Sequence, residues 1–276
     1  WAWHYKEIWA LVYGNIVGIF IKMLLSHAPN IGERCRFCWD KSAVHEIFHF
    51  GKWIFLSSTL GFLLYQGDRL LLGGLISAEV LGIYTVAFFL ANALREVITK
   101  LVSSVFFPVL SQVVREQSSQ IQHTYYKVRG KIDIISMFSA GFLFSTGGVI
   151  ISILYDQRYI DAGWMMEILS LSLIFVGFML SDQLFLSYGK SKHLSVLIVF
   201  QLVSLYILVP LLFILYGVEA SIWAIALNPI IRVIVSLIMM KKYYFLSFFR
   251  EIMFTPFVGV GFLVGEQIPK LITLFK

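Results

Sequence analysis

Charged and amide side chains interrupt three apolar stretches of this 276-residue chain. They lie in GFLLYQGDRLLLGG (61–74), in VAFFLANALREVITKLV (86–102) and in the apolar run around Asn228–Pro229. Together they are Asp68, Arg69, Asn92, Arg95, Glu96, Lys100, Asn228 and Arg232. Arginine keeps its charge and binds phosphate oxygens bidentately. We therefore interpret the three arginines, Lys100 and the two asparagines as a binding site for an anionic cargo, most simply one that bears phosphate.

The two carboxylates of this set, Asp68 and Glu96, have a different expected role. They balance the charge of the cations, or they bind a coupling proton or sodium ion. A purely structural network of ion pairs is the alternative for the whole set. Asp68 and Arg69 have a further alternative role. Arg69 would extend to the outer membrane interface, and Asp68 would cap a contact between two helices.

A second motif, His45-Glu46-Ile47-Phe48-His49, has the HExxH spacing of zinc peptidases. A zinc site needs a third protein ligand, and no acidic motif of the expected kind follows in the sequence. We interpret the two histidines as residues on the polar face of an interfacial helix. We therefore expect no metal and no cofactor, and we expect the Cys35/Cys38 pair to be reduced thiols in a loop.

The composition indicates whether water or lipid surrounds the helices that carry these groups. The chain is 59% hydrophobic and 14% charged, with a mean hydropathy of +0.82, whereas soluble domains carry about 25% charged residues. Apolar runs of ~20 residues recur, which is the length that crosses a bilayer. We predict an all-α polytopic membrane protein. The net charge of +6 then reflects the orientation of the loops, and we expect no nucleic-acid partner.

About eight transmembrane helices are predicted from these apolar runs. The expected spans are 8–26, 53–76, 80–107, 132–155, 162–188, 194–216, 218–240 and 252–269. Arg95 is near the middle of its span, where a charged side chain costs ~2.5–3.5 kcal/mol unless it faces protein or water. Pro229 should kink its span one turn before Arg232. Glu96 and Lys100 have the spacing of an i,i+4 ion pair.

Lysine and arginine residues accumulate in alternate connectors, which predicts the direction of the spans. Thirteen lie on one side: Arg34, Arg36, Lys41, Lys52, Arg115, Lys127, Arg129, Lys131, Lys190, Lys192, Lys241, Lys242 and Arg250. Only Lys6, Arg158, Lys270 and Lys276 lie on the other. The thirteen-residue side is therefore predicted to be cytoplasmic. On this side we expect an amphipathic interfacial helix at 38–52, a second interfacial stretch at Tyr125–Tyr126, and an interfacial Asp182.

Several segments resemble the oligosaccharide flippases of the polysaccharide-biosynthesis type. These flippases belong to the multidrug, oligosaccharidyl-lipid and polysaccharide exporter superfamily. The segments are RFCWDKSAVHEIFHFGKW (36–53), YQGDRLLLGGLISAEVLGIYTVAFFLANAL (65–94), FFPVLS (106–111), ISILYDQRYIDAGWMMEILSLS (151–172), YGKSKHL (188–194) and YGVEASIWAIAL (216–227). They follow the family's order along nearly the whole chain, and 68–82 is the most specific part.

The resemblance implies two six-helix bundles around a central cavity that work by alternating access. Residues 1–30 would then be the last helix of the first bundle, 31–52 a cytoplasmic amphipathic linker, 53–241 the second bundle and 242–276 a peripheral helix. We expect the chain, which begins at Trp1, to lack most of the first bundle.

The resemblance also implies a function and partners. The cargo would be an oligosaccharide repeat unit linked to undecaprenyl diphosphate, such as an O-antigen unit of lipopolysaccharide. It would move from the cytoplasmic to the outer leaflet of the bacterial inner membrane, with a proton or sodium ion as the driving partner. Membrane lipid, a polysaccharide polymerase and glycosyltransferases are the other implied partners.

Three alternative functions remain at this point. A multidrug or lipid II exporter of the same superfamily shares the fold, although a drug exporter should have a cavity dominated by acidic residues. An HExxH membrane protease would need zinc. A polytopic ligase usually has a large outer loop, and the predicted outer connectors are short. We therefore do not expect an enzyme.

Overall fold

The computed structural model describes residues 8–26, 40–41, 44–45, 59–116, 118–243, 247, 250–251 and 253–274. The chain divides into two units, residues 1–54 and residues 55–276. The first unit contains helix α2 (Ile8–Ser26), a 19-residue apolar helix with exposed side chains along its described length. The second unit contains all the remaining helices and is described by itself below.

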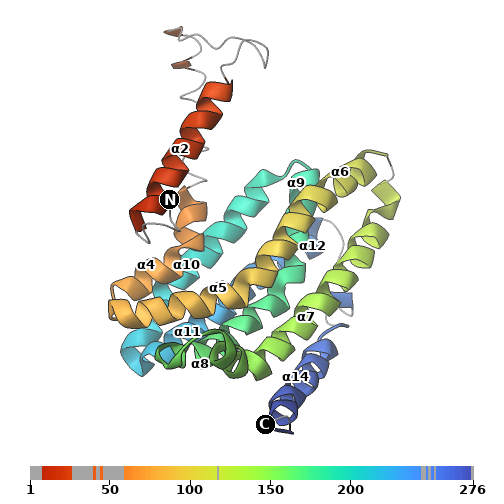
Figure 1. Ribbon diagram of the computed structural model, residues 1–276. Coiled ribbons are helices and arrows are strands. Elements are labelled where there is room, and N and C mark those ends of the chain that lie inside the picture. Colours follow the sequence, from red (N-terminus) through yellow and green to blue (C-terminus); the bar gives the residue numbers. More distant parts are fainter. Residues whose placement is uncertain are drawn as a thin grey trace. The chain divides into compact units, whose positions relative to one another are not determined.

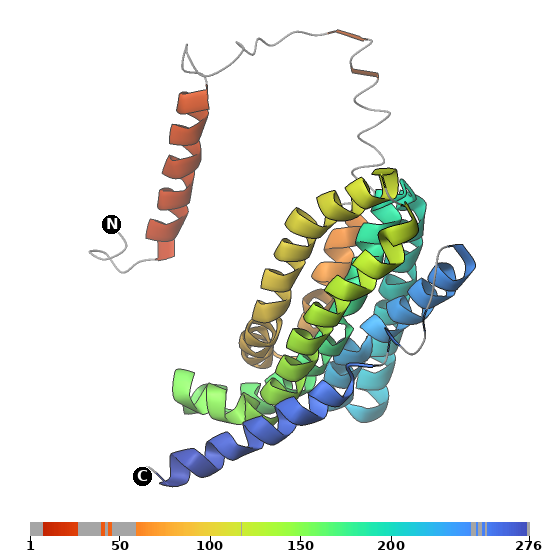
Figure 2. The same cartoon turned by 90° about the vertical axis from the view of Figure 1, so that its right-hand side faces the viewer.

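The second unit is a bundle of helices that cross one another closely (Figure 1, Figure 2). A helical stretch at 59–65 leads into it. The helices are α4 (Gly67–Gly73), α5 (Ala78–Leu101), α6 (Phe107–Glu116), α7 (Ile121–Leu154), α8 (Ala162–Ser170), α9 (Met179–Ser187), α10 (Ser191–Tyr216), α11 (Val218–Leu227), α12 (Pro229–Tyr243) and α14 (Pro256–Leu274). The described residues contain no strand, which confirms the all-α prediction.

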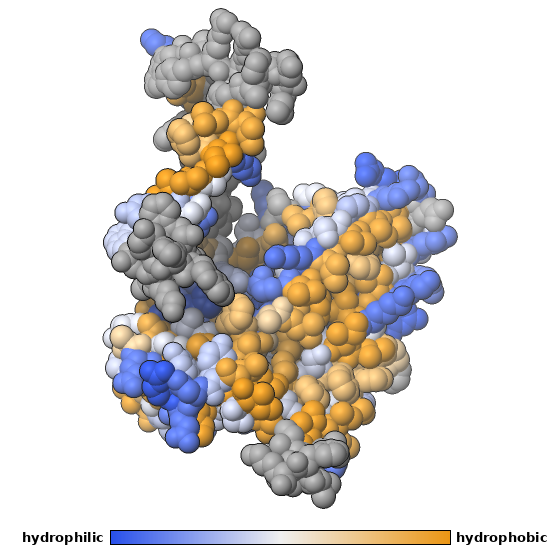
Figure 3. All heavy atoms as spheres, in the orientation of Figure 1, coloured by the Kyte–Doolittle hydropathy of each residue, from blue (hydrophilic) through white to orange (hydrophobic). Residues whose placement is uncertain are grey.

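Among the described residues, five helical segments are long and apolar enough to cross a bilayer. They are Ala78–Glu116, Ile121–Leu154, Ala162–Ser187, Lys192–Tyr216 and Val218–Lys241. Large apolar side chains such as Phe89, Val97 and Leu101 are exposed along α5, and an apolar band follows α5 and α6 across the surface in Figure 3. Exposed apolar surface of this extent suits lipid as the surrounding medium. The chain is therefore a multi-pass membrane protein.

The connectors between the spans are shorter than the sequence predicts. Residues 108–131, expected to form a loop, are largely helical, because α6 continues from α5 and α7 begins at Ile121. Figure 1 shows the α6–α7 and α9–α10 connections at one end of the bundle and the α10–α11 connection at the other. The last of these turns at Gly217, whose φ of 82° favours glycine.

Two of the spans change their winding partway along. Between α5 and α6 the chain is a π-helix, Val102–Phe106, just before Pro108. Between α8 and α9 it is a 3₁₀-helix of eight residues, Leu171–Phe178, longer than the usual three or four. The last span is interrupted at Asn228, where α11 ends and α12 begins with Pro229, as the proline predicts.

Small residues let helix backbones approach one another in this bundle. A Cβ added to Gly163 on α8 would lie 2.8 Å from the Cα of Gly148 on α7. Between α7 and α14, a Cβ at Gly141 or Gly261 would overlap the backbone of the opposite helix. Close packing at small residues is typical of membrane helices. Helix α14 thus packs tightly along α7 (Figure 2).

Candidate functional site

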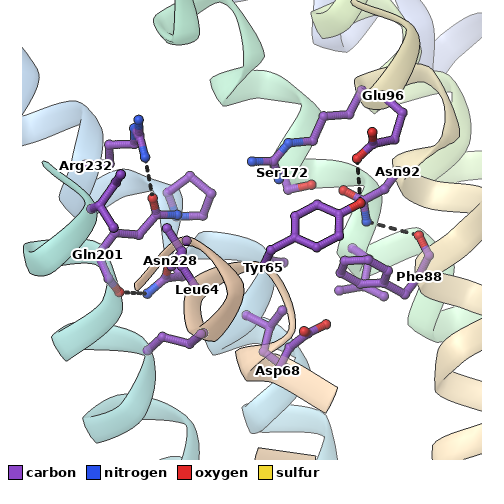
Figure 4. A pocket seen from close by; sticks show the side chains of 18 residues that line it. Leu64, Tyr65, Asp68, Phe88, Asn92, Glu96, Ser172, Gln201, Asn228 and Arg232 are labelled. Carbon is purple, nitrogen blue, oxygen red and sulfur yellow. Dashed lines mark hydrogen bonds between the residues drawn. The ribbon is translucent and has the colours of Figure 1, made fainter. Parts of the chain in front are cut away.

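A cavity of about 230 Å³ lies inside the bundle and is bordered by the 59–65 stretch and by α4, α5, α8, α10, α11 and α12. Its polar lining residues are Tyr65, Asp68, Asn92, Arg95, Glu96, Ser172, Gln201, Asn228 and Arg232. Six of the eight residues singled out in the sequence are therefore brought to one cavity (Figure 4): Asp68, Asn92, Arg95, Glu96, Asn228 and Arg232. Residues far apart in the chain converge here because α5, α10 and α12 border the same space.

Arg232 is fixed in the lining by two side chains from other helices. Its Nη2 donates to Asp182 Oδ2 at 2.6 Å, and its Nη1 donates to Gln201 Oε1 at 3.2 Å. Asp182 is buried, which corrects the prediction that it is interfacial. The physical reason is its charge partner, because an ion pair with good geometry reduces the cost of burying a carboxylate. Asp182 thus places α9 against α12.

Asn228 is held where the last span breaks. Its Nδ2 donates to the Gln201 carbonyl at 3.2 Å and to Ser204 Oγ at 2.7 Å. These bonds link the break between α11 and α12 to α10 (Figure 4). The amide is therefore occupied in packing, and Gln201 bridges Asn228 and Arg232 through its backbone and its side chain.

Arg95 differs from Arg232 because its guanidinium makes no hydrogen bond and no ion pair within the described part of the chain, although its carbonyl accepts from Thr99. It lines the 230 Å³ cavity and also an adjoining cavity of about 70 Å³, which shares Arg95, Ser172, Gln201, Pro229 and Arg232. Snorkelling from the middle of α5 is difficult, and Arg95 lines the two cavities inside the bundle. A guanidinium without a fixed partner in such a space is available to bind a ligand.

Both carboxylates of the lining accept hydrogen bonds from tyrosine hydroxyl groups. Tyr65 Oη donates to Glu96 Oε1 at 2.7 Å (Figure 4), and Tyr84 Oη donates to Asp68. The expected ion pair between Glu96 and Lys100 is absent from the described structure. Asp68 is 4% exposed, and its second oxygen has no hydrogen-bond partner among the described residues. The lining therefore contains as many carboxylates as cations, and not the cationic surplus that the sequence indicated.

Arg69 and Lys100 do not line either cavity. Arg69 donates to Gln66 Oε1 at 2.8 Å, and its guanidinium carbon lies 4.5 Å from the centroid of the Phe88 ring. Lys100 is exposed in the last turn of α5. A role for either side chain in binding cargo stays a prediction.

Sequence reasoning missed four polar lining or supporting residues: Tyr65, Ser172, Gln201 and Asp182. Gln201 had a usable signal, since it interrupts the run VLIVFQLV (196–203) as Arg95 interrupts α5. Ser172 had no such signal in the sequence, because serine is common in membrane helices. Its Oγ is buried without a partner among the described residues.

The end of α7 that the sequence predicts to be cytoplasmic also differs from expectation. Tyr125 and Tyr126 were expected at the interface and Arg129 in a loop, yet all three are buried. Helix α7 starts eleven residues earlier than the predicted span at 132, and this extension places the three residues against other helices.

The HExxH motif lies outside the described residues apart from His45, as do both cysteines and most of the predicted 38–52 helix. Among the described residues no group of three or more His, Cys, Asp or Glu side chains is placed to hold a metal.

Comparisons with known proteins bear on the family. Searches among curated proteins and among solved structures each gave no match. A sequence model of a family described as polysaccharide biosynthesis protein matches residues 1–163, the part that runs from α2 to the start of α8. This match covers more than half of the chain and includes Asp68, Asn92, Arg95 and Glu96 of the cavity lining. The chain therefore belongs to the polysaccharide biosynthesis protein family.

Proposed function

We propose that this chain is part of a flippase that moves a polyprenyl-diphosphate-linked oligosaccharide from the cytoplasmic to the outer leaflet by alternating access. The membrane would be the bacterial inner membrane. The observation that carries the proposal is Arg95, a permanent cation in the middle of a membrane helix that lines the cavity and whose guanidinium makes no hydrogen bond or ion pair among the described residues. The family supports a role in polysaccharide biosynthesis, and the multi-pass fold supports transport.

The mixture of groups in the lining suits a headgroup that carries both phosphate and sugar. The Arg95 guanidinium matches phosphate oxygens bidentately. Carboxylates and amides of the same lining, such as Asn92 and Glu96, are suited to hydrogen bonds with sugar hydroxyl groups. Acidic residues do not dominate this lining, which argues against the drug-exporter alternative.

The cavity lowers the main barrier to flipping, which is the passage of a charged and hydroxylated headgroup through hydrocarbon. The polyprenyl chain can stay in lipid while the headgroup occupies the cavity. At about 230 Å³ the cavity is smaller than the ~300–1,000 Å³ of sites for drug-sized ligands, so it would hold only part of the cargo headgroup. The resemblance to two-bundle flippases assigns the remainder to another bundle.

Asp68 is the best candidate for ion coupling. It is buried and lines the cavity, and one of its carboxylate oxygens has no hydrogen-bond partner among the described residues. Such an oxygen can take up a proton or help to coordinate sodium. Exchange of that ion on the two sides of the membrane would then bias the cavity toward one opening.

The test uses full-length protein in cells that depend on it for surface polysaccharide. Arg95→Gln is expected to abolish the polysaccharide while protein remains in the membrane, because glutamine removes the charge at similar length. Arg95→Lys keeps the charge but loses the bidentate geometry, so partial activity is expected.

Arg115→Gln is the matched control. Arg115 is an exposed cation on α6 that donates only to a backbone carbonyl of its own helix, that of Ser111. Normal polysaccharide in this control and none in Arg95→Gln supports the proposal. Normal polysaccharide in Arg95→Gln would remove Arg95 from the mechanism and with it the basis of the proposal.

A further inference from the structure

A second cavity, of about 360 Å³, lies beside the first turns of α7 and the segment that precedes α14. Its lining includes Tyr126, Lys127, Arg129, Arg250, Met253 and Phe254. It shares no residue with the central cavity or with the smaller cavity that adjoins it. Its contents therefore do not depend on the function proposed above.

The lining of this second cavity is cationic. It contains three cationic side chains, Lys127, Arg129 and Arg250, and no carboxylate among the described lining residues. Asp133 and Glu251, behind the lining, balance the charge of Arg129, so the positive charge that faces a ligand comes from Lys127 and Arg250. Lys127 and Arg250 are exposed at its rim. The guanidinium carbon of Arg250 lies 5.3 Å from the centroid of the Tyr126 ring, a distance at which a cation and an aromatic face attract each other.

Arg129 forms the rigid base of the site. It is fully buried and forms ion pairs with Asp133, at 3.2 Å, and with Glu251. Its Nη1 donates to Tyr125 Oη at 3.2 Å, and its guanidinium carbon lies 3.9 Å from the centroid of the Phe178 ring. Its Nη2 has no hydrogen-bond partner in the described part of the chain. Nη2 is itself buried, so Arg129 anchors the base of the site and is not an exposed donor.

The segment that carries Arg250 is attached to α7 through Tyr126. Tyr126 Oη donates to Glu251 Oε1 at 2.9 Å and accepts from the backbone N–H of Ser247 at 2.9 Å. Burial raises the pKa of the Glu251 carboxyl, and the Arg129 guanidinium opposes that rise. These contacts hold the rim cations near the buried one.

The position of the cavity indicates where its ligand comes from. It lies at the end of α7 where the sequence places most lysines and arginines, the end predicted to be cytoplasmic. Hydrophilic residues gather where α6 meets α7 in Figure 3. The lining also contains apolar surface, since Met253 is 45% exposed. Basic pockets with apolar walls at this surface suit the headgroups of anionic lipids.

We propose that this second cavity binds the phosphate-bearing headgroup of an anionic membrane lipid. Lys127 and Arg250 attract the phosphate at the rim, above the anchored side chain of Arg129. Met253 and Phe254 contact the apolar part of the lipid. The bound lipid would bridge α7 and the segment before α14, which the cavity separates.

The experiment measures lipid binding to the purified full-length chain in detergent by native mass spectrometry. The probes are phosphatidylglycerol, phosphatidylcholine of the same chain length, undecaprenyl diphosphate and inorganic pyrophosphate. Phosphatidylglycerol is expected to bind more tightly than phosphatidylcholine. The variant Lys127→Gln/Arg250→Gln removes two charges worth about 1 kcal/mol each at a membrane surface, so phosphatidylglycerol should bind about 30-fold more weakly.

The control variant is Arg115→Gln/Lys131→Gln, which removes one arginine and one lysine that are exposed at the same end but do not line the cavity. It should change binding by about threefold or less, since its charges act only at a distance. Stronger binding of undecaprenyl diphosphate than of phosphatidylglycerol, with the same variant dependence, would identify the lipid as the cargo lipid itself.

Three results would overturn the proposal. The first is equal binding of phosphatidylglycerol and phosphatidylcholine. The second is an equal loss in the control variant, which would show a general surface charge effect. The third is pyrophosphate binding as tightly as phosphatidylglycerol, which would show an anion site without lipid specificity. Both variants change exposed side chains, and their melting temperatures in detergent should match that of the unchanged chain.

Discussion

Two ion pairs of this protein have the same N–O distance of 2.6 Å, but one is largely buried and the other is exposed. Comparing them tests how much burial contributes to the coupling between two charges. The side chains of Arg232 and Asp182 are 21% and 10% exposed, whereas those of Arg158 and Asp156 are 84% and 52% exposed. In the exposed pair, a hydrogen bond from Arg158 lowers the pKa of Asp156. We predict strong coupling in the buried pair and none that can be measured in the exposed pair.

The expected size follows from the burial of each partner. Removing one member of a buried ion pair leaves the other charge uncompensated and costs about 3–5 kcal/mol. Arg232 is about one fifth exposed, so the lower end, about 3 kcal/mol, applies to Asp182→Asn and to Arg232→Gln. The double variant Asp182→Asn/Arg232→Gln removes both charges, so it should lose about 3 kcal/mol, no more than either single variant, where independent effects would add to about 6 kcal/mol. The expected coupling energy is therefore about 3 kcal/mol. Exposed pairs are screened by water and salt.

The assay is a double-mutant cycle on the free energy of unfolding, measured by reversible denaturation in mixed micelles. The control cycle uses Asp156→Asn and Arg158→Gln, which change the same atoms in an exposed loop. If the buried double variant is as unstable as the sum of its single variants, the two charges are not coupled. The assignment of Asp182 as the fixed partner of Arg232 would then be wrong.

The remaining predictions concern the packing of α7 against α8 and the hydrogen bond from Tyr84 to Asp68. Gly163→Ala should lower the free energy of unfolding by about 1–3 kcal/mol because its Cβ would press on the Gly148 backbone, while Gly82→Ala, in open space on α5, should be neutral or stabilising in the same denaturation assay. A loss in both variants, or in neither, would contradict the close contact of α7 and α8. Tyr84→Phe removes the hydroxyl that bonds Asp68 and should cost about 1–3 kcal/mol. An unchanged stability would show that Asp68 does not depend on this bond.

The sequence was sufficient to predict five of the spans, since 80–107, 132–155, 162–188, 194–216 and 218–240 each overlap a described helix long and apolar enough to cross a bilayer. The predicted spans 8–26, 53–76 and 252–269 have no counterpart among these five helices. Runs of apolar residues are long because the bilayer has a fixed thickness, so span positions are visible without any knowledge of packing. Polar interruptions within those runs were equally visible. For this reason Arg95, Asn228 and Arg232 could be assigned to one cavity from their depth, although the same reasoning assigned Arg69 and Lys100 to it and neither of these lines it.

What the sequence did not show is which charge pairs with which. Asp182 was expected at the interface because its span seemed to end nearby, but only the crossing of α9 and α12 brings it to Arg232. Arg129 was counted as a loop cation. Its charge is balanced by two carboxylates, Asp133 one helical turn away and Glu251, which is distant in the chain. Partner choice depends on helix rotation and crossing, and apolar periodicity defines neither in a helix that is apolar on all sides.

The eight-residue 3₁₀ stretch between α8 and α9 has a consequence for the length of its span. A 3₁₀-helix rises about 2.0 Å per residue against 1.5 Å in an α-helix, so this stretch is about 4 Å longer than an α-helix of the same residues. It also winds about 20° further per residue, or about 160° in all. Rewinding it would both shorten the span and turn the helix face that carries Asp182. The salt bridge across to Arg232 therefore opposes any rewinding of this stretch.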